Sequence, residues 1–289
     1  MITRTATIAA VVCAALCTAG AGSGAATKGP CGAYAHRPAP AHLAHVVWIW
    51  FENHGYSDIA GSSDAPYLNA IAGSCGLATN YQSVAHPSLP NYIAATSGST
   101  QGIEDDGLPP SHTLTVPSIF SQVDAKSFEQ AMPENCDLSD TDIYAVRHNP
   151  EVYYLPLRRA CRANNVPLGR FNARRLPQFS FVTPDMCSDM HSCSVADGDT
   201  WLRGFLPRII ASPDYRAGRT VVFITFDESE QSDDNRVFTA VLSEWTPAGK
   251  RVATSLSHYS LLRTTEELLG VSLLGNAQTA ASMRRPFHL

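Results

Sequence analysis

Charged residues are scarce in this sequence of 289 residues, and no run of basic residues occurs. Without a basic run, we expect no binding to nucleic acid through its phosphate backbone. Charged residues make up 16% of the chain and apolar residues 44%, a balance that excludes a disordered chain and a coiled coil. The net charge of −5 is mild and identifies no partner. Neither an internal repeat nor a linker-like stretch occurs, so we predict one domain over residues 27–289.

Long apolar runs are also missing, with one exception at the N-terminus. Arg4 is followed by an apolar stretch over residues 8–21 and then by small residues. This pattern predicts a signal peptide over residues 1–26, cleaved between Ser23 and Ala26, and therefore a secreted protein. An uncleaved membrane anchor is the alternative, although the run is short for a span of about 20 residues. No later stretch is long and apolar enough, so we expect no stable membrane insertion.

The sequence has no pair of cysteines at CxxC spacing, which disfavours a cysteine metal site. Outside the predicted signal peptide, six cysteines remain. An even number in an exported chain predicts three disulfides, for which about 15 pairings are possible. Cys187 and Cys193 are close enough to close a small loop. The other pairs that we predict are Cys31 with Cys75 and Cys136 with Cys161.

Short runs of β-branched and aromatic residues predict buried strands. These runs cover residues 45–51, 179–183, 220–226 and 237–242. Helical patterns lie between them, at residues 65–72, 89–96, 117–122, 200–210 and 258–269, whereas residues 98–116 form a long polar loop. Strands that alternate with helices predict an α/β fold, with a mostly parallel sheet covered by helices on both faces.

Polar side chains follow three of these strands at the point where each strand ends. In sheets of this kind, ligands bind at the carboxyl ends of the strands. Each side chain alone could be a solvated cap or an ion-pair partner, but three strands delivering them to one edge indicate a site. The residues are Glu52 and Asn53 after the first strand, Asp185, Asp189 and His191 after the second, and Asp227 and Glu228 after the third.

Oxygen donors dominate this set, and oxygen ligands suit one hard divalent cation such as Mg²⁺, Ca²⁺ or Mn²⁺, whereas imidazole would favour Zn²⁺. Adjacent buried carboxylates also need a cation or solvent to offset their charge. Ser88 begins a helical stretch after Pro87, where helix N–H groups favour an anion. A hydroxyl on a divalent cation becomes a usable nucleophile. A plain helix cap is the alternative for Ser88.

Six short motifs occur in a fixed order between residues 45 and 270, and together they resemble the secreted bacterial phosphoesterase family. They are ENH, HPSLPNYIAATSG, RHNPEVYY, PDMCSDMHSCSVADGDTWL, TFDE and SHYSLLRTTEELLG. That family includes acid phosphatases and phospholipases C of the alkaline-phosphatase-like superfamily. Its fold is a three-layer α/β/α sandwich with a mixed, mostly parallel sheet, which the resemblance implies for this chain.

The resemblance also implies roles for individual residues. Ser88 matches the nucleophile, which also ligates the metal and forms a phosphoserine. The other implied metal ligands are Glu52, Asn53, Asp227 and Glu228. Three histidines match groups that hold phosphate oxygens or protonate the leaving group, namely His148, His191 and His258, and His86 and Asp189 lie near the substrate. If the histidines supply positive charge when protonated, activity has an acidic to neutral optimum.

The chain is shorter than the phospholipases C of this family, and it has no basic, aromatic-rich stretch for binding lipid surfaces. Small phosphate monoesters are therefore the favoured substrates. Hydrolysis of phosphodiesters or phospholipids is the close alternative. A secreted binding protein that keeps the fold without catalysis is an alternative of another class. The presence of Glu52, Ser88 and Asp227 disfavours that alternative.

Overall fold

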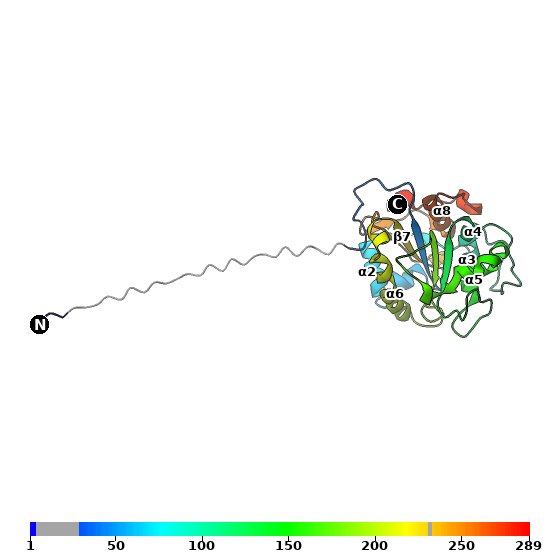
Figure 1. Ribbon diagram of the computed structural model, residues 1–289, viewed down its shortest axis with the longest axis horizontal. Helices are drawn as coiled ribbons and strands as arrows, with labels where there is room; N and C mark the ends of the chain where they lie inside the picture. The colour runs from blue at the N-terminus through cyan, green and yellow to red at the C-terminus, as the bar shows by residue number, and fades with distance from the viewer. Residues whose placement is uncertain (4–28, 231–232) are drawn as a thin grey trace.

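The computed structural model describes residues 1–3, 29–230 and 233–289 (Figure 1). The predicted signal peptide, with its cleavage site between Ser23 and Ala26, lies outside the described residues except for residues 1–3. Among the described residues, every helix is too short or too polar to cross a membrane.

An eight-stranded sheet with the order β5-β4-β6-β1-β7-β8-β2-β9 forms the centre of the fold. The strands from β5 to β7 run parallel, and β8 runs antiparallel to both of its neighbours. Strands β3 (Tyr81–Gln82) and β10 (Leu256–Ser257) form a separate parallel pair. The bounds in the large sheet are β1 His45–Phe51, β2 Gly76–Ala78, β4 Ala125–Glu129, β5 Asn165–Pro167, β6 Phe179–Thr183, β7 Thr220–Phe226, β8 Thr239–Leu242 and β9 Lys250–Val252.

Helices cover both faces of this sheet, which confirms the predicted three-layer α/β/α sandwich. In Figure 1, α2 and α6 lie on one side of the strands and α3 and α8 on the other. The α-helices are α1 Tyr56–Ile59, α2 Pro66–Ser74, α3 Ser88–Ser97, α4 Ile119–Gln122, α5 Arg158–Asn164, α6 Val195–Ile210, α7 Pro213–Arg216, α8 His258–Leu269 and α9 Arg284–Phe287. Short 3-10 helices occupy Val146–His148, Pro150–Tyr153, Leu155–Leu157, Leu168–Arg170, Asp233–Asn235 and Gly275–Gln278.

Strand β1 is buried on both faces because consecutive side chains pack against opposite helical layers. Trp50 packs against Tyr92 of α3, with ring centroids 4.8 Å apart. Phe51, the next residue, packs against Trp201 of α6 at 6.0 Å. This two-sided burial explains why β1, β6 and β7 consist of apolar residues almost throughout, and why their bounds match the prediction.

Other elements depart from the predicted bounds for local reasons. The strand expected from residue 237 begins at Thr239, because Val237 forms only an isolated bridge with Gly55. The helix expected over residues 200–210 begins at Val195, because Ser194 caps it by accepting the Asp197 N–H at 3.3 Å. Strand β4 was not predicted, because it is short and three of its five residues are polar.

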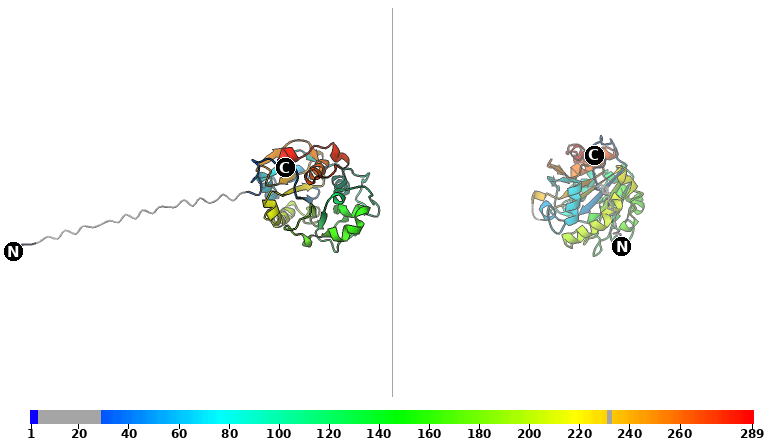
Figure 2. Two further views of the ribbon diagram at one scale, coloured as in Figure 1. Left: turned by 45° about the horizontal axis from the view of Figure 1, so that its top comes forward. Right: turned by 90° about the vertical axis from the view of Figure 1, so that its left-hand side faces the viewer.

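Three disulfides join the cysteines in the predicted pairs. Cys31–Cys75 links the first described residues after the N-terminal gap to the end of α2. Cys136–Cys161 joins the loop after β4 to α5, and Cys187–Cys193 closes a loop after β6. The C-terminal segment, red in Figure 2, lies beside α8. The Met283 N–H donates there to Thr264 Oγ1 at 2.8 Å.

Glu266 on α8 gives the first testable prediction, a loss of stability at alkaline pH. Its Oε1 accepts the Leu274 N–H at 3.0 Å, and its Oε2 is buried without a hydrogen-bond partner among the described residues. Burial raises the pKa of this carboxyl to about 8. Because the folded state holds the proton more tightly than the unfolded state, the free energy of unfolding falls as pH rises from about 4.5 through about 8. Glu266→Gln keeps the acceptor and removes this loss.

The measurement is the melting temperature of both proteins between pH 5 and 9. We expect the substitution to stabilise more at pH 8.5 than at pH 5.5. Glu267→Gln is the matched control, because Glu267 is partly exposed and pairs with Arg263 at 2.8 Å. Parallel curves for wild type and Glu266→Gln would contradict the prediction.

Candidate active site

The carboxyl ends of β1, β6 and β7 meet at one edge of the sheet, because these strands are parallel neighbours. Hydrogen bonds donated by the main-chain N–H groups of Glu52 and Asn53 hold the three strand ends together. The Glu52 N–H donates to the Asp189 carbonyl at 2.9 Å, and the Asn53 N–H donates to Asp227 Oδ1 at 2.9 Å. Asn53 has a φ of 58°, a conformation that asparagine tolerates better than most residues. The structure therefore brings Glu52, Asp189 and Asp227, three of the residues predicted at this edge, close together.

Ser88 lies at this edge as the first residue of α3. Its Oγ donates to Glu52 Oε2 at 3.0 Å, and the Tyr92 hydroxyl, one turn later, donates to Glu52 Oε1. Asn91 fixes the turn before the helix, since its Oδ1 accepts the N–H groups of Val84 and Ala85, both at 3.0 Å. The helix therefore presents Ser88 and Tyr92 from the same face to one buried carboxylate.

The carboxyl groups at this edge are buried together, and burial raises their pKa values. For Glu52 the desolvation is the largest cause, and the nearby Asp227 and Asp189 raise the pKa further. Burial raises the pKa of Asp227 and of Asp189 to about 7, and that of Glu228 to about 8. The Ser88 hydroxyl lowers the pKa of both Asp227 and Glu228 and so opposes the effect of burial.

A divalent cation fits this donor set. Asp227 Oδ2 is buried and has no hydrogen-bond partner among the described residues, so it is free to ligate. Of the predicted ligands, Glu52 contacts Ser88 Oγ directly, and Asp227 Oδ1 accepts the main-chain N–H of the residue after Glu52. Ligand atoms of Glu52, His148 and His191 also lie within 4.8 Å of one another, which adds two imidazoles that the predicted ligand set did not contain. Oxygen ligands favour a hard cation, and imidazoles favour a borderline metal such as Zn²⁺.

His148 and His191 lie beside these carboxylates. The ring of His148 lies between Asp189, with Nδ1 3.2 Å from Oδ2, and Glu52, with Nε2 3.3 Å from Oε2. Nε2 of His191 accepts from Arg147 Nη2 at 3.0 Å. Desolvation is the main cause that lowers the pKa of both rings, and for His148 the nearby Arg147 lowers it further.

His258 has a different setting. Both of its ring nitrogens are engaged, because Nε2 donates to the Asp227 carbonyl at 2.7 Å and Nδ1 accepts from the Tyr81 hydroxyl at 3.1 Å. The side chain is fully buried, and burial lowers its pKa to about 4. The ring is therefore neutral and supports the backbone of Asp227. His86, whose side chain is about half exposed, contacts Glu228 through Nδ1.

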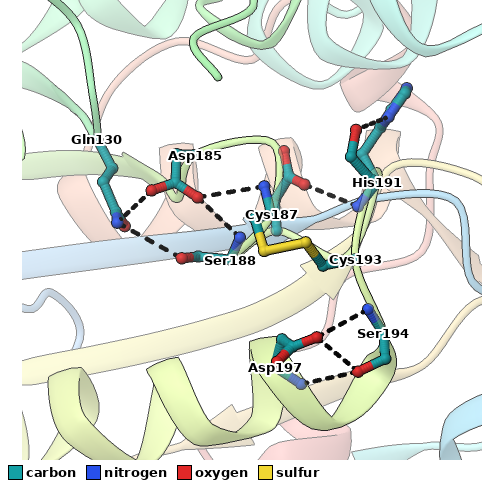
Figure 3. Close-up of a disulfide and its surroundings, with 10 residues drawn as sticks. Gln130, Asp185, Cys187, Ser188, His191, Cys193, Ser194 and Asp197 are labelled. Atoms are coloured by element: carbon teal, nitrogen blue, oxygen red, sulfur yellow. Dashed lines mark hydrogen bonds between the residues drawn. A yellow bond between two sulfur atoms is a disulfide. The ribbon is translucent and has the colours of Figure 1, made fainter. Parts of the chain in front are cut away.

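The loop after β6 is held by its own hydrogen bonds (Figure 3). The Asp185 carboxylate accepts the N–H groups of Cys187 and Ser188, at 3.2 and 2.8 Å, and a hydrogen bond from the Gln130 amide at 2.5 Å. Asp185 thus orders the loop and does not reach the carboxylate cluster through any of these contacts. Asp189, four residues later, carries the contact to His148.

Sequence reasoning missed three side chains at the site. Tyr92 holds Glu52, and Arg147 holds His191. Asp106 comes from the long polar loop; its Oδ1 accepts the Leu89 N–H at 2.9 Å, and its Oδ2 lies 3.7 Å from Arg147 Nε. Two of them had a local signal, because Tyr92 follows Ser88 by one helical turn and Arg147 directly precedes His148. Asp106 had none beyond its place in a loop that follows α3.

Known proteins resemble this chain in fold and in sequence. A protein of the alkaline phosphatase superfamily from Vibrio parahaemolyticus has the same fold, with a TM-score of 0.56 and 12% identity, over 86% of this chain and 73% of that one. The phosphatidylinositol-3-phosphatase of Mycobacterium tuberculosis is 28% identical over 82% of this chain and 81% of its own length. An acid phosphatase of Aspergillus fumigatus is 28% identical over 81% of this chain and 57% of its own length, so this chain spans little more than half of the fungal protein.

The sequence relatives and the family match over residues 58–272 identify a hydrolase that acts on phosphate ester bonds. Residues 58–272 match the sequence profile of the phosphoesterase family, and the chain therefore belongs to that family. The resemblance inferred from the six motifs is confirmed.

Proposed function

We propose that this chain is a secreted, metal-dependent phosphoesterase that hydrolyses small phosphate monoesters with Ser88 as its nucleophile. One observation carries the proposal: the hydroxyl of Ser88, the first residue of α3, lies 3.0 Å from the buried Glu52 carboxylate. Asp227 and Glu228 follow β7 at the same edge of the sheet. The names of the two relatives, a phosphatidylinositol-3-phosphatase and an acid phosphatase, support the monoester as substrate.

The buried carboxyl groups of Glu52, Asp227 and Glu228, with the oxygens of Asn53 and Ser88, would hold one divalent cation. Bound there, a cation offsets the carboxylate charge and lowers the pKa of the hydroxyl that it contacts. The contact between Ser88 and Glu52 orients the serine oxygen whether or not a cation is bound. The proposed metal set takes no ligand from His258, which the hydrogen bonds to Asp227 and Tyr81 occupy.

The reaction has two steps. Ser88 Oγ attacks phosphorus in line, the bond from phosphorus to the ester oxygen breaks, and a phosphoserine and an alcohol form. Water then attacks the phosphoserine, releasing inorganic phosphate and restoring the hydroxyl. The fixed positive charge of Arg147 lies beside His191 and is available to phosphate oxygens at any physiological pH.

We assign proton transfer to the departing alcohol to Nδ1 of His191, because Nε2 accepts from Arg147 and because this ring is partly exposed whereas those of His148 and His258 are buried. His148, held between Asp189 and Glu52, faces the serine's carboxylate partner and would contact phosphate oxygens. His258 becomes a positioning residue for Asp227. His86 and Asp189 line the same site through their contacts with Glu228 and His148.

We also propose that residues 27–289 form a single phosphoesterase domain, which residues 1–26 direct to export as a signal peptide that is then cleaved. The three disulfides support export, because such bonds persist in oxidising compartments.

The testing experiment measures hydrolysis of p-nitrophenyl phosphate and of p-nitrophenylphosphorylcholine between pH 5 and 9, with and without EDTA. We expect the monoester to be hydrolysed faster than the diester. EDTA should abolish the activity, and a divalent cation should restore it. The rate should fall toward alkaline pH, since His191 must carry a proton to act as an acid.

Other outcomes of this experiment favour the alternatives. A faster rate on the diester favours phospholipase C or phosphodiesterase activity. Full activity after exhaustive chelation contradicts the metal requirement. No hydrolysis of any ester favours a binding protein that keeps the fold without catalysis.

A further inference from the structure

The loop from Asp185 to Ser194, here called the disulfide loop, carries two site residues separated by one position. Asp189 makes three contacts: its carbonyl accepts the Glu52 N–H at 2.9 Å, its Oδ2 lies 3.2 Å from His148 Nδ1, and its Oδ1 accepts the His191 N–H at 2.8 Å. The loop therefore sets the position of His148 and His191 together. A shift of its backbone would move both rings relative to Glu52.

Met190, between these two residues, has a backbone conformation that needs support. Its φ is 78°, in the left-handed region that a long side chain rarely adopts. Its side chain is 2% exposed and packs against Gly198 in the first turns of α6. A Cβ added at Gly198 would lie 2.5 Å from Met190 Cε and 2.9 Å from the Ser188 carbonyl oxygen. Only a glycine on α6 leaves room for the loop in this position.

The Cys187–Cys193 disulfide closes the same loop near its two ends (Figure 3). Cys187 and Cys193 flank Asp189, Met190 and His191 with a sequence separation of 6. Ser192, inside the ring that this bond closes, donates its N–H at 2.7 Å to the carbonyl of Met186, the residue just before the ring. The loop is thus fixed at its ends by the disulfide and at its centre by Met190.

We propose that Met190, Gly198 and the Cys187–Cys193 disulfide are positioning residues of the active site. They hold the left-handed conformation at residue 190. In this way they keep the Asp189 carboxylate in contact with His148, and they keep His191 in contact with Arg147. None of the three touches a reacting atom. The inference rests on the proposed function for its effect on catalysis, but the contacts themselves can be tested without an activity.

The first test compares two glycines of one helix. Gly198→Ala should force the loop away from α6, whereas Gly204→Ala is the matched control, because a Cβ at Gly204 meets no atom within 4 Å. We expect Gly198→Ala to lower kcat on p-nitrophenyl phosphate by about 10- to 100-fold, the range expected when catalytic groups are displaced by about 1 Å. Gly204→Ala should keep kcat within about twofold, since both substitutions suit a helix interior.

A second variant approaches the same contact from the loop. Met190→Gly permits the left-handed φ but removes the side chain that anchors it, so kcat should again fall by about tenfold or more. This variant keeps the inference testable if Gly198→Ala does not fold. Wild-type kcat in a folded Met190→Gly protein would overturn the role of the side chain.

The third test separates positioning from general stabilisation by deleting one disulfide at a time. Cys31–Cys75 closes a longer stretch than Cys187–Cys193, with a separation of 44 against 6, and lies near Tyr215, before the amino end of β7. Its replacement by two alanines should lower the melting temperature more, because longer loops contribute more. Replacement of Cys187 and Cys193 should lower kcat more. If the loss of Cys31–Cys75 lowers both the melting temperature and kcat more than the loss of Cys187–Cys193 does, the second disulfide has only a structural role. That result would overturn the inference.

Hydrogen exchange provides a readout that needs no activity. The amides of Glu52 and His191 donate to Asp189, so we expect both to exchange faster in Gly198→Ala than in wild type and Gly204→Ala. Equal exchange in Gly198→Ala and Gly204→Ala would overturn the inference even if the enzyme is active. If wild type hydrolyses no ester, the proposed function fails, and the exchange comparison still decides whether these residues position the loop.

Discussion

Replacing Ser88 with alanine is expected to lower kcat on p-nitrophenyl phosphate by about 10³-fold or more, the scale of loss seen when a covalent nucleophile is removed. The hydroxyl that donates to Glu52 Oε2 at 3.0 Å is the only group removed, so the fold should persist. Activity is measured as initial rate at saturating substrate. The melting temperature reports whether the variant is folded.

Ser97→Ala is the matched control for this experiment. Ser97 is also a buried serine of α3, but it lies at the other end of the helix and donates to the Ile93 carbonyl at 2.9 Å. It should retain activity within about twofold, while losing a hydrogen bond worth about 1 kcal/mol of stability. Ser88→Ala with more than a tenth of wild-type activity would refute the assignment of the nucleophile.

Acid quenching during turnover of a phosphate monoester extends this test to the intermediate. A phosphoserine formed at residue 88 should be found by mass spectrometry of the quenched wild-type protein. The same peptide from Ser88→Ala should carry no phosphate. Phosphate on another serine would move the nucleophile to that residue.

Asp227→Asn is the second substitution for which we expect a large effect. The amide keeps the shape of the side chain and can still accept the Asn53 N–H, which Asp227 Oδ1 accepts at 2.9 Å. It removes the negative charge of a buried carboxylate whose Oδ2 has no hydrogen-bond partner among the described residues. We therefore expect the protein to lose its divalent cation, and kcat to fall by about 10²-fold or more, since a bound cation contributes several kcal/mol to catalysis.

Bound metal is measured by atomic emission after gel filtration, beside the rate on p-nitrophenyl phosphate. Glu266→Gln is the control, because it neutralises another buried carboxyl, outside the site, and should keep both the metal and the rate. Asp227→Asn with full metal content and full activity would contradict the proposed ligand set. Loss of activity with full metal content would instead assign Asp227 a role beyond holding the cation.

The central strands and the site edge could be predicted from the sequence because their physical causes are local. Strands β1, β6 and β7 are buried on both faces, so their apolar runs mark their bounds, and Glu52 and Asp227 stand where those runs stop. Strands such as β4 and β9 could not be predicted, because β4 contains Lys126 and β9 begins with Lys250 and Arg251, which break the apolar pattern.

The assignments of single histidines were beyond sequence reasoning, because they depend on partners far away in the chain. His258 matches a family position, but its ring nitrogens are taken by the Asp227 carbonyl and by Tyr81, 31 and 177 residues away. In the same way, the contact of Asp106 with Leu89 depends on where a long loop crosses the helix. Such contacts follow from tertiary packing and leave no periodic pattern.

The reversed direction of β8 separates two surfaces of the enzyme. Because β8 runs antiparallel to β7, the segment that leaves it emerges at the edge opposite Glu52 and Asp227. That segment ends in an exposed turn at Ala248 and Gly249. A label or an immobilisation tag attached at this turn would therefore face away from incoming substrate, which gives a handle for single-molecule or surface-based assays.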